Sequence, residues 1–309
     1  MTTNLMTTTR RRGLLLALLT AVISGVAIFL NAYGVRAVGN ATVYTTAKNV
    51  VAALVLIAVT TAGRGRGLAV TRPRGPVQWW GLVAVGVIGG SVPFVLFFEG
   101  LARASSTQAA FLNKTLVLWV ALLAVVVLKE RLLPWHWVAI GLLLVGQAGL
   151  SGGVGPTLGS GELLILAATL LWAIEVVIAK RLLGGLSSWT VGLARMGFGS
   201  AALVGWLLVT GSGGALLTLD AAQWGWVLLT GLVLAGYVAT WFAALARAQA
   251  VDVTAVLVLA ALITAGLNAV VNGTPLAPQL GWLLVLLAGG TLIGALAWRR
   301  APREQPAAT

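Results

Sequence analysis

Residues 98–104 read Phe98-Glu99-Gly100-Leu101-Ala102-Arg103-Ala104, and residues 242–248 read Phe242-Ala243-Ala244-Leu245-Ala246-Arg247-Ala248. The two segments share Phe, Leu, Ala and Arg in register at an offset of 144 residues. The same offset pairs Gln78-Trp79-Trp80-Gly81 with Ala222-Gln223-Trp224-Gly225. Apolar chains share Leu and Ala by chance, whereas Trp, Phe and Arg in register indicate an internal repeat.

The repeat is built from long apolar segments. Of the 309 residues, 59% are hydrophobic and 9% are charged, whereas about a quarter of the residues in soluble domains are charged. A hydrocarbon core about 30 Å thick needs about 20 helical residues to cross it. Ten segments have roughly this length: 13–30, 41–62, 77–98, 105–128, 135–150, 162–179, 189–210, 222–242, 251–271 and 280–298. We therefore predict an all-α membrane protein with about ten transmembrane helices.

Each copy of the repeat contains five spans, and an odd number places the second copy upside down in the membrane. Such inverted repeats are typical of secondary transporters, whose binding site lies near the midplane where the copies meet. We predict two five-helix repeats, at 13–150 and 162–298, joined by a linker at 151–161. Tails at 1–12 and 299–309 flank them. One five-helix half is expected to rock against the other.

The distribution of Lys and Arg predicts that both termini are cytoplasmic, because positive residues are retained on that side. With the amino terminus inside, fifteen of the twenty Lys and Arg fall on one side and only Arg36 and Arg103 on the other. Segment 13–30 is longer than the apolar region of a signal peptide, so we predict a retained first span. The expected location is the plasma (inner) membrane, crossed several times.

Composition excludes several other functions. The chain has no cysteine and a single histidine, His136, which is expected in a cytoplasmic loop, so we predict no metal site and no cofactor. The net charge is +13, but the basic residues are scattered between apolar runs, which argues against nucleic acid as a partner. No phosphate-binding loop of an ATP-driven motor is found.

Four charged residues lie several residues away from the ends of their spans, and we predict that they bind the substrate: Lys48, Lys114, Glu175 and Arg195. A charged side chain at the bilayer centre costs about 2.5–3.5 kcal/mol on insertion scales, so it usually faces the protein interior or a watery cavity. Asn113 adds an amide beside Lys114 and joins the predicted site.

Each of these charges has a structural alternative. Lys114 lies about nine residues into its span, near the bilayer centre, and it either faces substrate or joins two helices through an ion pair with Glu175. Lys48 and Arg195 are near-equivalents across the repeat, and either one contacts substrate or reaches the interface. Glu175 either carries a proton for coupled transport or forms a static salt bridge.

Residues 116–132 form an apolar run closed by Glu130-Arg131-Leu132, and a helix with spaced glycines follows, here Gly141 and Gly146. In these features the chain resembles the EamA-type transporters of the drug/metabolite transporter superfamily, whose fourth helix ends in the same way. The second copy departs from this pattern, with Thr274-Pro275-Leu276 at the equivalent place. The resemblance spans the whole chain and implies transport, commonly export, rather than enzymatic activity.

Three cations against one carboxylate in the spans favour a solute with an anionic group. We therefore predict a secondary transporter, either proton-linked or facilitative, that moves a small organic solute by alternating access, with export as the direction that the resemblance implies. A lipid flippase or scramblase would share a cation-lined groove and is an alternative, and an intramembrane enzyme is a further one. The expected partners are a small-molecule solute and membrane lipid, and the chain is either a monomer or a homodimer.

Overall fold

The computed structural model describes residues 2–63, 68–104, 106–152 and 159–299, and for residues 2–8 and 106–107 it describes the backbone only. The first half contains α1 (Thr2–Val38), α2 (Ala41–Ala62), α3 (Pro76–Ala84), the π-helix η1 (Val85–Gly89), α4 (Val92–Leu101), α5 (Ser106–Lys114), α6 (Leu116–Val127) and α7 (Pro134–Leu150). The second half contains α8 (Ser160–Leu182), α9 (Ser188–Val209), η2 (Gly213–Leu216), α10 (Ala221–Leu245), α11 (Ala250–Leu257), α12 (Ala260–Asn272), η3 (Ala277–Gln279) and α13 (Leu280–Arg299). The fold is all-helical, as predicted.

Within the described residues, nine helical stretches are long and apolar enough to cross a membrane, and α7, with 17 residues, is a shorter apolar helix. Together they account for the ten expected spans. The helix of the first span begins at Thr2, so the predicted tail at 1–12 is largely helical.

Three spans expected to be continuous helices are interrupted. The third is divided into α3, η1 and α4, and it leaves helical geometry at Ser91, where φ is −139°. Two adjacent glycines, Gly89 and Gly90, and Pro93 weaken the helix there, because proline lacks an N–H donor. The fourth span breaks at Thr115, between α5 and α6, and the ninth at Leu259, 144 positions later, between α11 and α12. The break in the fourth span is thus repeated in the ninth, whereas the eighth span, α10, is a continuous helix.

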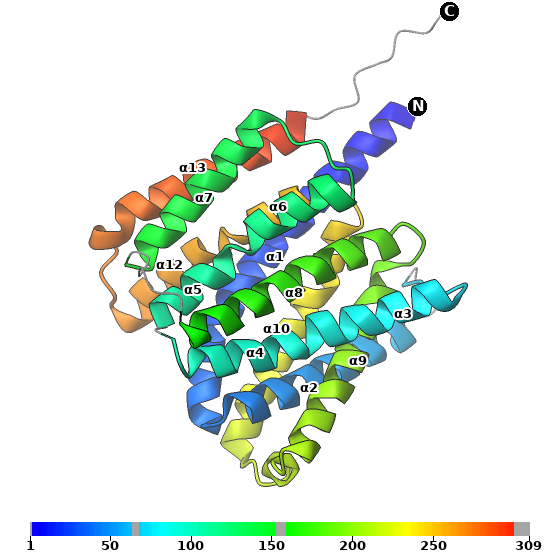
Figure 1. Cartoon of the computed structure of the whole chain (residues 1–309), viewed down its shortest axis with the longest axis vertical. Helices are drawn as coiled ribbons and strands as arrows, with labels where there is room; N and C mark the ends of the chain where they lie inside the picture. Colours follow the sequence, from blue (N-terminus) through cyan, green and yellow to red (C-terminus); the bar gives the residue numbers. More distant parts are fainter. Residues whose placement is uncertain (1, 64–67, 105, 153–158, 300–309) are drawn as a thin grey trace, which may run out of the picture.

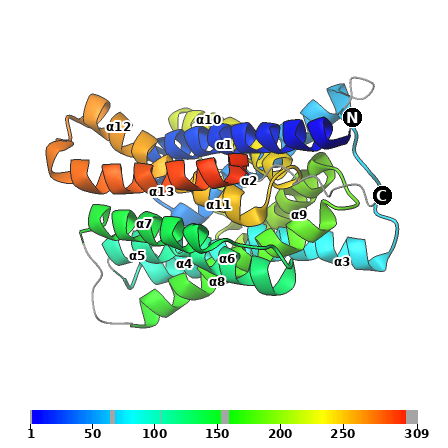
Figure 2. The same cartoon turned by 90° about the horizontal axis from the view of Figure 1, so that it is seen from above.

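The two halves do not form separate bundles. The helix α1 packs mainly on α10, α11 and α12 of the second half, and α8 packs mainly on α3, η1, α4, α5 and α6 of the first. Figure 2 shows α1 in the layer of α10 and α12, and α8 in the layer of α4, α5 and α6. The first helix of each repeat is therefore exchanged into the other repeat, so the two five-helix halves are not separate bodies. The rocking of one half against the other stays a prediction.

The helices run roughly side by side along one direction, which defines two ends of the bundle (Figure 1). We call the end where α1 begins and α13 ends the terminal end, and the opposite end the far end. At the terminal end the Arg11 guanidinium lies 4.2 Å from the centroid of the Trp298 ring, which brings these two helices together.

Candidate functional site

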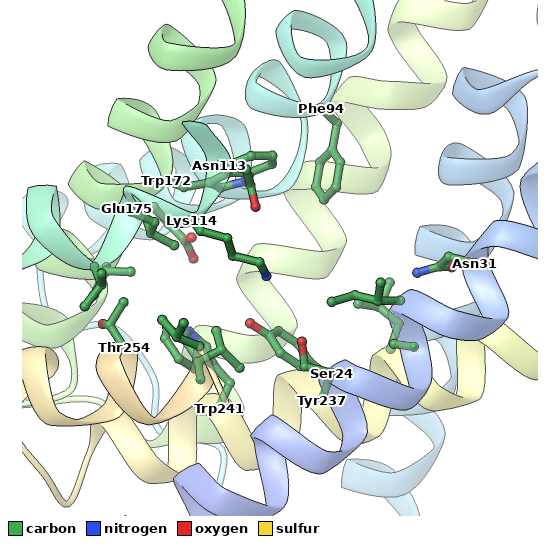
Figure 3. Close-up of a pocket in the computed structure, with 18 of the residues that line it drawn as sticks. Ser24, Asn31, Phe94, Asn113, Lys114, Trp172, Glu175, Tyr237, Trp241 and Thr254 are labelled. Atoms are coloured by element: carbon green, nitrogen blue, oxygen red, sulfur yellow. The ribbon is translucent and has the colours of Figure 1, made fainter. Parts of the chain in front are cut away.

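A cavity of about 280 Å³ lies among helices of both halves, in the middle of the bundle. Its lining comes from α1, α2, α4, α5, α6, α8, α9, α10 and α11. Figure 3 shows the side chains that surround it. Ligand pockets typically measure about 300–1,000 Å³, so this cavity suits a small organic molecule.

All five predicted site residues line this one cavity: Lys48, Asn113, Lys114, Glu175 and Arg195. They are drawn from four helices, α2, α5, α8 and α9, that lie far apart in the sequence. The cost of exposing a charge to lipid explains why they gather inside the protein. Their role in binding substrate stays a prediction.

Lys114 is the last residue of α5 and points into the cavity (Figure 3). Among the described residues, none accepts a hydrogen bond from its ammonium or forms an ion pair with it. The alternative in which Lys114 pairs with Glu175 is wrong, because Glu175 pairs with Arg195 instead. The break after α5 places this lysine at a helix end inside the membrane region.

Glu175 and Arg195 form a buried ion pair on one wall of the cavity. The Nε of Arg195 donates to Oε1 of Glu175 at 3.0 Å, and Nη2 of Arg195 donates to the Gly89 carbonyl at 3.1 Å. The indole N–H of Trp172 donates to the same carbonyl, also at 3.1 Å. The π-helix η1 ends at Gly89, and π-turns leave carbonyls available for other donors.

Lys48 belongs to a second polar cluster, nearer the far end. Its Nζ donates to Oδ1 of Asn31 at 3.2 Å and lies 5.0 Å from the centroid of the Tyr44 ring. The Tyr44 hydroxyl lies 2.7 Å from Oδ1 of Asn31 and 2.9 Å from the Thr230 hydroxyl. The sequence reasoning missed Asn31, because this residue follows directly after the predicted span 13–30 and has apolar neighbours in the sequence.

Aromatic side chains form much of the remaining wall. Phe94 and Trp172 meet edge to face with centroids 5.4 Å apart, and Tyr237 stacks on Trp241 at 6.0 Å. All four line the cavity. Tryptophan is most common at membrane interfaces, so Trp172 in mid-span was a signal of a buried site that the sequence reasoning did not use.

Charged side chains contact one another at the terminal end. The Nη2 of Arg10 lies 2.8 Å from Oδ2 of Asp252 on α11, and Nε2 of His136 lies 3.9 Å from Oδ1 of the same aspartate. His136 and Asp252 have fully buried side chains. The expectation that His136 lies in a loop is therefore wrong, because Pro134 starts α7 early enough to carry the imidazole into the protein.

Two further contacts hold the connection between α10 and α11. The carboxylate of Glu130 accepts from the backbone N–H of Ala250 at 2.9 Å, at the start of α11. The Lys180 ammonium donates to the carbonyls of Leu245 and Ala248. Burial raises the pKa of the Glu130 carboxyl, and the backbone hydrogen bonds oppose that shift in part. Glu130 thus has a structural role at this end.

A metal centre is not suggested by the geometry. Among the described residues, no group of three or more His, Asp or Glu side chains could hold a metal ion. The cavity instead offers ammonium, guanidinium and amide donors together with aromatic faces. This set of groups suits an organic molecule with an acidic group.

Comparisons with known proteins agree with this architecture. A family model described as "EamA-like transporter family" matches residues 11–152 and again residues 159–296. No curated protein matches the chain. A solved structure described only as "Crystal structure of protein" is 21% identical, with a TM-score of 0.70, over 92% of this chain and 98% of that chain. At that identity the likeness shows the fold alone.

Proposed function

The chain belongs to the EamA-like transporter family, and from this premise we propose that it is a secondary transporter of a small organic solute with an anionic group. The family makes it a multi-pass membrane transporter. The solute class, the coupling and the direction are our proposal, and the cavity supports it.

The ammonium of Lys114 is the observation that carries the proposal. It extends into the cavity, and within the described part of the chain it has no carboxylate partner. A solute carboxylate 4 Å away would gain about 4 kcal/mol of Coulomb energy at an effective dielectric constant of 20. An anionic group thus fits this position better than a neutral or cationic one.

Alternating access in our proposal uses the terminal end as one gate, because ion pairs and hydrogen bonds join the helices there. With the termini in the cytoplasm, as the distribution of basic residues predicts, this gate is the inner one. Because α1 and α8 are exchanged, the moving units in our proposal mix helices of both repeats.

Proton coupling is assigned to Glu175. Among the described residues that line the cavity it is the one carboxylate, and protonation would release Arg195 from its ion pair. The variant Glu175→Gln should lose the dependence of solute flux on a pH gradient. An unchanged dependence would make the ion pair static and would leave coupling to another group.

The proposal is tested with the full chain in proteoliposomes. Uptake of lactate, leucine, succinate and glycerol 3-phosphate is measured beside choline and glucose as cationic and neutral controls. We expect flux of an anion, no flux of choline, and at least about a tenfold loss in Lys114→Ala, since a charged hydrogen bond contributes about 1.5–3 kcal/mol. Lys114→Arg keeps the charge and is the matched control.

Equal flux in wild type and Lys114→Ala for every transported solute would refute this site assignment. Transport of choline in preference to the anions would refute the solute class. Movement of a fluorescent phospholipid between leaflets, measured in the same vesicles, would favour a lipid flippase instead.

A further inference from the structure

Each half of the protein contains a pair of polar residues at equivalent positions, and the two pairs differ in chemistry. The helix α8 ends 144 positions after α1, which makes Glu175 the counterpart of Asn31. The helix α9 begins and ends 147 positions after α2, which makes Arg195 the counterpart of Lys48. Inverted repeats place such counterparts on related sides of a shared site.

Both pairs form the equivalent hydrogen bond. Arg195 donates to the side-chain oxygen of Glu175 at 3.0 Å, and Lys48 donates to the side-chain oxygen of Asn31 at 3.2 Å. All four residues line the same cavity. The difference is chemical, because an amide stands in the first half where the second half has a carboxylate.

This difference leaves the Lys48 pair with a net positive charge. The oxygen of Asn31 is already engaged by Lys48 and lies 2.7 Å from the Tyr44 hydroxyl. Its amide nitrogen is on the side of the cavity (Figure 3), and an amide nitrogen only donates hydrogen bonds. The pair therefore presents an ammonium and an N–H donor, which together match an anionic oxygen.

The charges of all the described lining residues also favour an anionic solute. Arg195 is neutralised by Glu175, so Lys48 and Lys114 remain as two cations without a carboxylate among the described lining residues. Charges inside a protein are unfavourable unless they are paired. A solute with two negative charges would satisfy both lysines.

Resting on the proposed function, we propose that Lys48 and Asn31 form a second anion-binding position, and that the transported solute is a dianion. One negative charge lies at Lys48 and Asn31, and the other at Lys114. A dicarboxylate and a phosphate monoester share this chemistry, so succinate and glycerol 3-phosphate serve as the two probes.

The test introduces into the first half the acidic residue that the second half has at the equivalent position. The variant Asn31→Glu gives Lys48 the carboxylate that Arg195 has, and Asn31→Gln is the matched neutral control of the same length. In proteoliposomes we expect Asn31→Glu to raise the apparent KM for the transported dianion at least about tenfold over Asn31→Gln. We expect wild type to take the dianion in preference to lactate.

A second pair of variants, at Lys48, keeps the inference testable if the Asn31 variants fail to fold. Lys48→Gln removes the charge and Lys48→Arg keeps it, and the same difference in KM is expected between them. Equal KM values within both pairs, or equal uptake of lactate and the dianions by wild type, would overturn this inference. If Lys114→Ala still lowers anion flux in that case, the proposed function stands, whereas a wild type that moves no anion refutes both.

Discussion

Replacing Gly89 by alanine tests how the carboxylate of Glu175 is held. A Cβ at Gly89 would lie 2.3 Å from Cδ of Glu175 and 2.8 Å from its Oε1. No side chain tolerates such an approach, so the carboxylate has to move and its 3.0 Å hydrogen bond to Arg195 is broken. A charged hydrogen bond contributes about 1.5–3 kcal/mol, and breaking a buried ion pair costs about 3–5 kcal/mol.

We therefore expect Gly89→Ala to lower the free energy of unfolding by about 3 kcal/mol. The matched control is Gly197→Ala, on the helix that carries Arg195, because a Cβ at Gly197 would meet nothing within 4 Å. A change within about 1 kcal/mol is expected there. Both are measured by denaturation of the purified chain in detergent micelles.

A double-mutant cycle identifies the cause of the loss. In a Glu175→Ala background the clash is absent, so the added cost of Gly89→Ala should be far smaller than in wild type. Residues in contact show such non-additive energies of about 0.5–3 kcal/mol. Equal costs of Gly89→Ala in both backgrounds would show that the carboxylate of Glu175 is not what the new methyl group displaces.

Two other predictions concern the terminal end. The chain has no cysteine, so a single Ser24→Cys substitution in the cavity reports whether a thiol reagent reaches the cavity. A membrane-impermeant maleimide should label it from the far end only, and the added change Asp252→Asn, which removes the charge facing Arg10, should allow labelling from the terminal end. Labelling confined to the far end in the double variant would contradict the role of this ion pair. For Glu130, burial raises the pKa above its ordinary 4.5, so the folded protein binds the proton more tightly than the unfolded chain. Its contribution to stability is present below pH 4.5 and is lost as the pH rises through the raised value. In Glu130→Gln this part of the pH dependence of unfolding should disappear, and an unchanged curve would contradict it.

The sequence was sufficient to predict the spans, the repeat and the charged residues of the cavity. Span positions follow from apolar length, and the repeat from Trp, Phe and Arg in register. Lys48, Lys114, Glu175 and Arg195 were identified because a charge in a span avoids lipid, and such charges converge on interior space. This reasoning needs no knowledge of which helices touch.

Contacts between helices were beyond the sequence. The pairing of Glu175 with Arg195 instead of Lys114 depends on η1 bringing Gly89 against the carboxylate, and a π-turn of five residues leaves no clear pattern in the sequence. The burial of His136 depends on Asp252, more than one hundred positions away. The exchange of α1 and α8 depends on packing between apolar surfaces that differ little in composition.

The exchange of α1 affects how the protein is made. The helix α1 leaves the ribosome long before its main partner, α10, which begins at Ala221. Until then Asn31 lacks the cluster completed by Thr230. Membrane insertion of the early helices therefore precedes their final packing, and neither half, expressed alone, contains the neighbours that its own first helix needs.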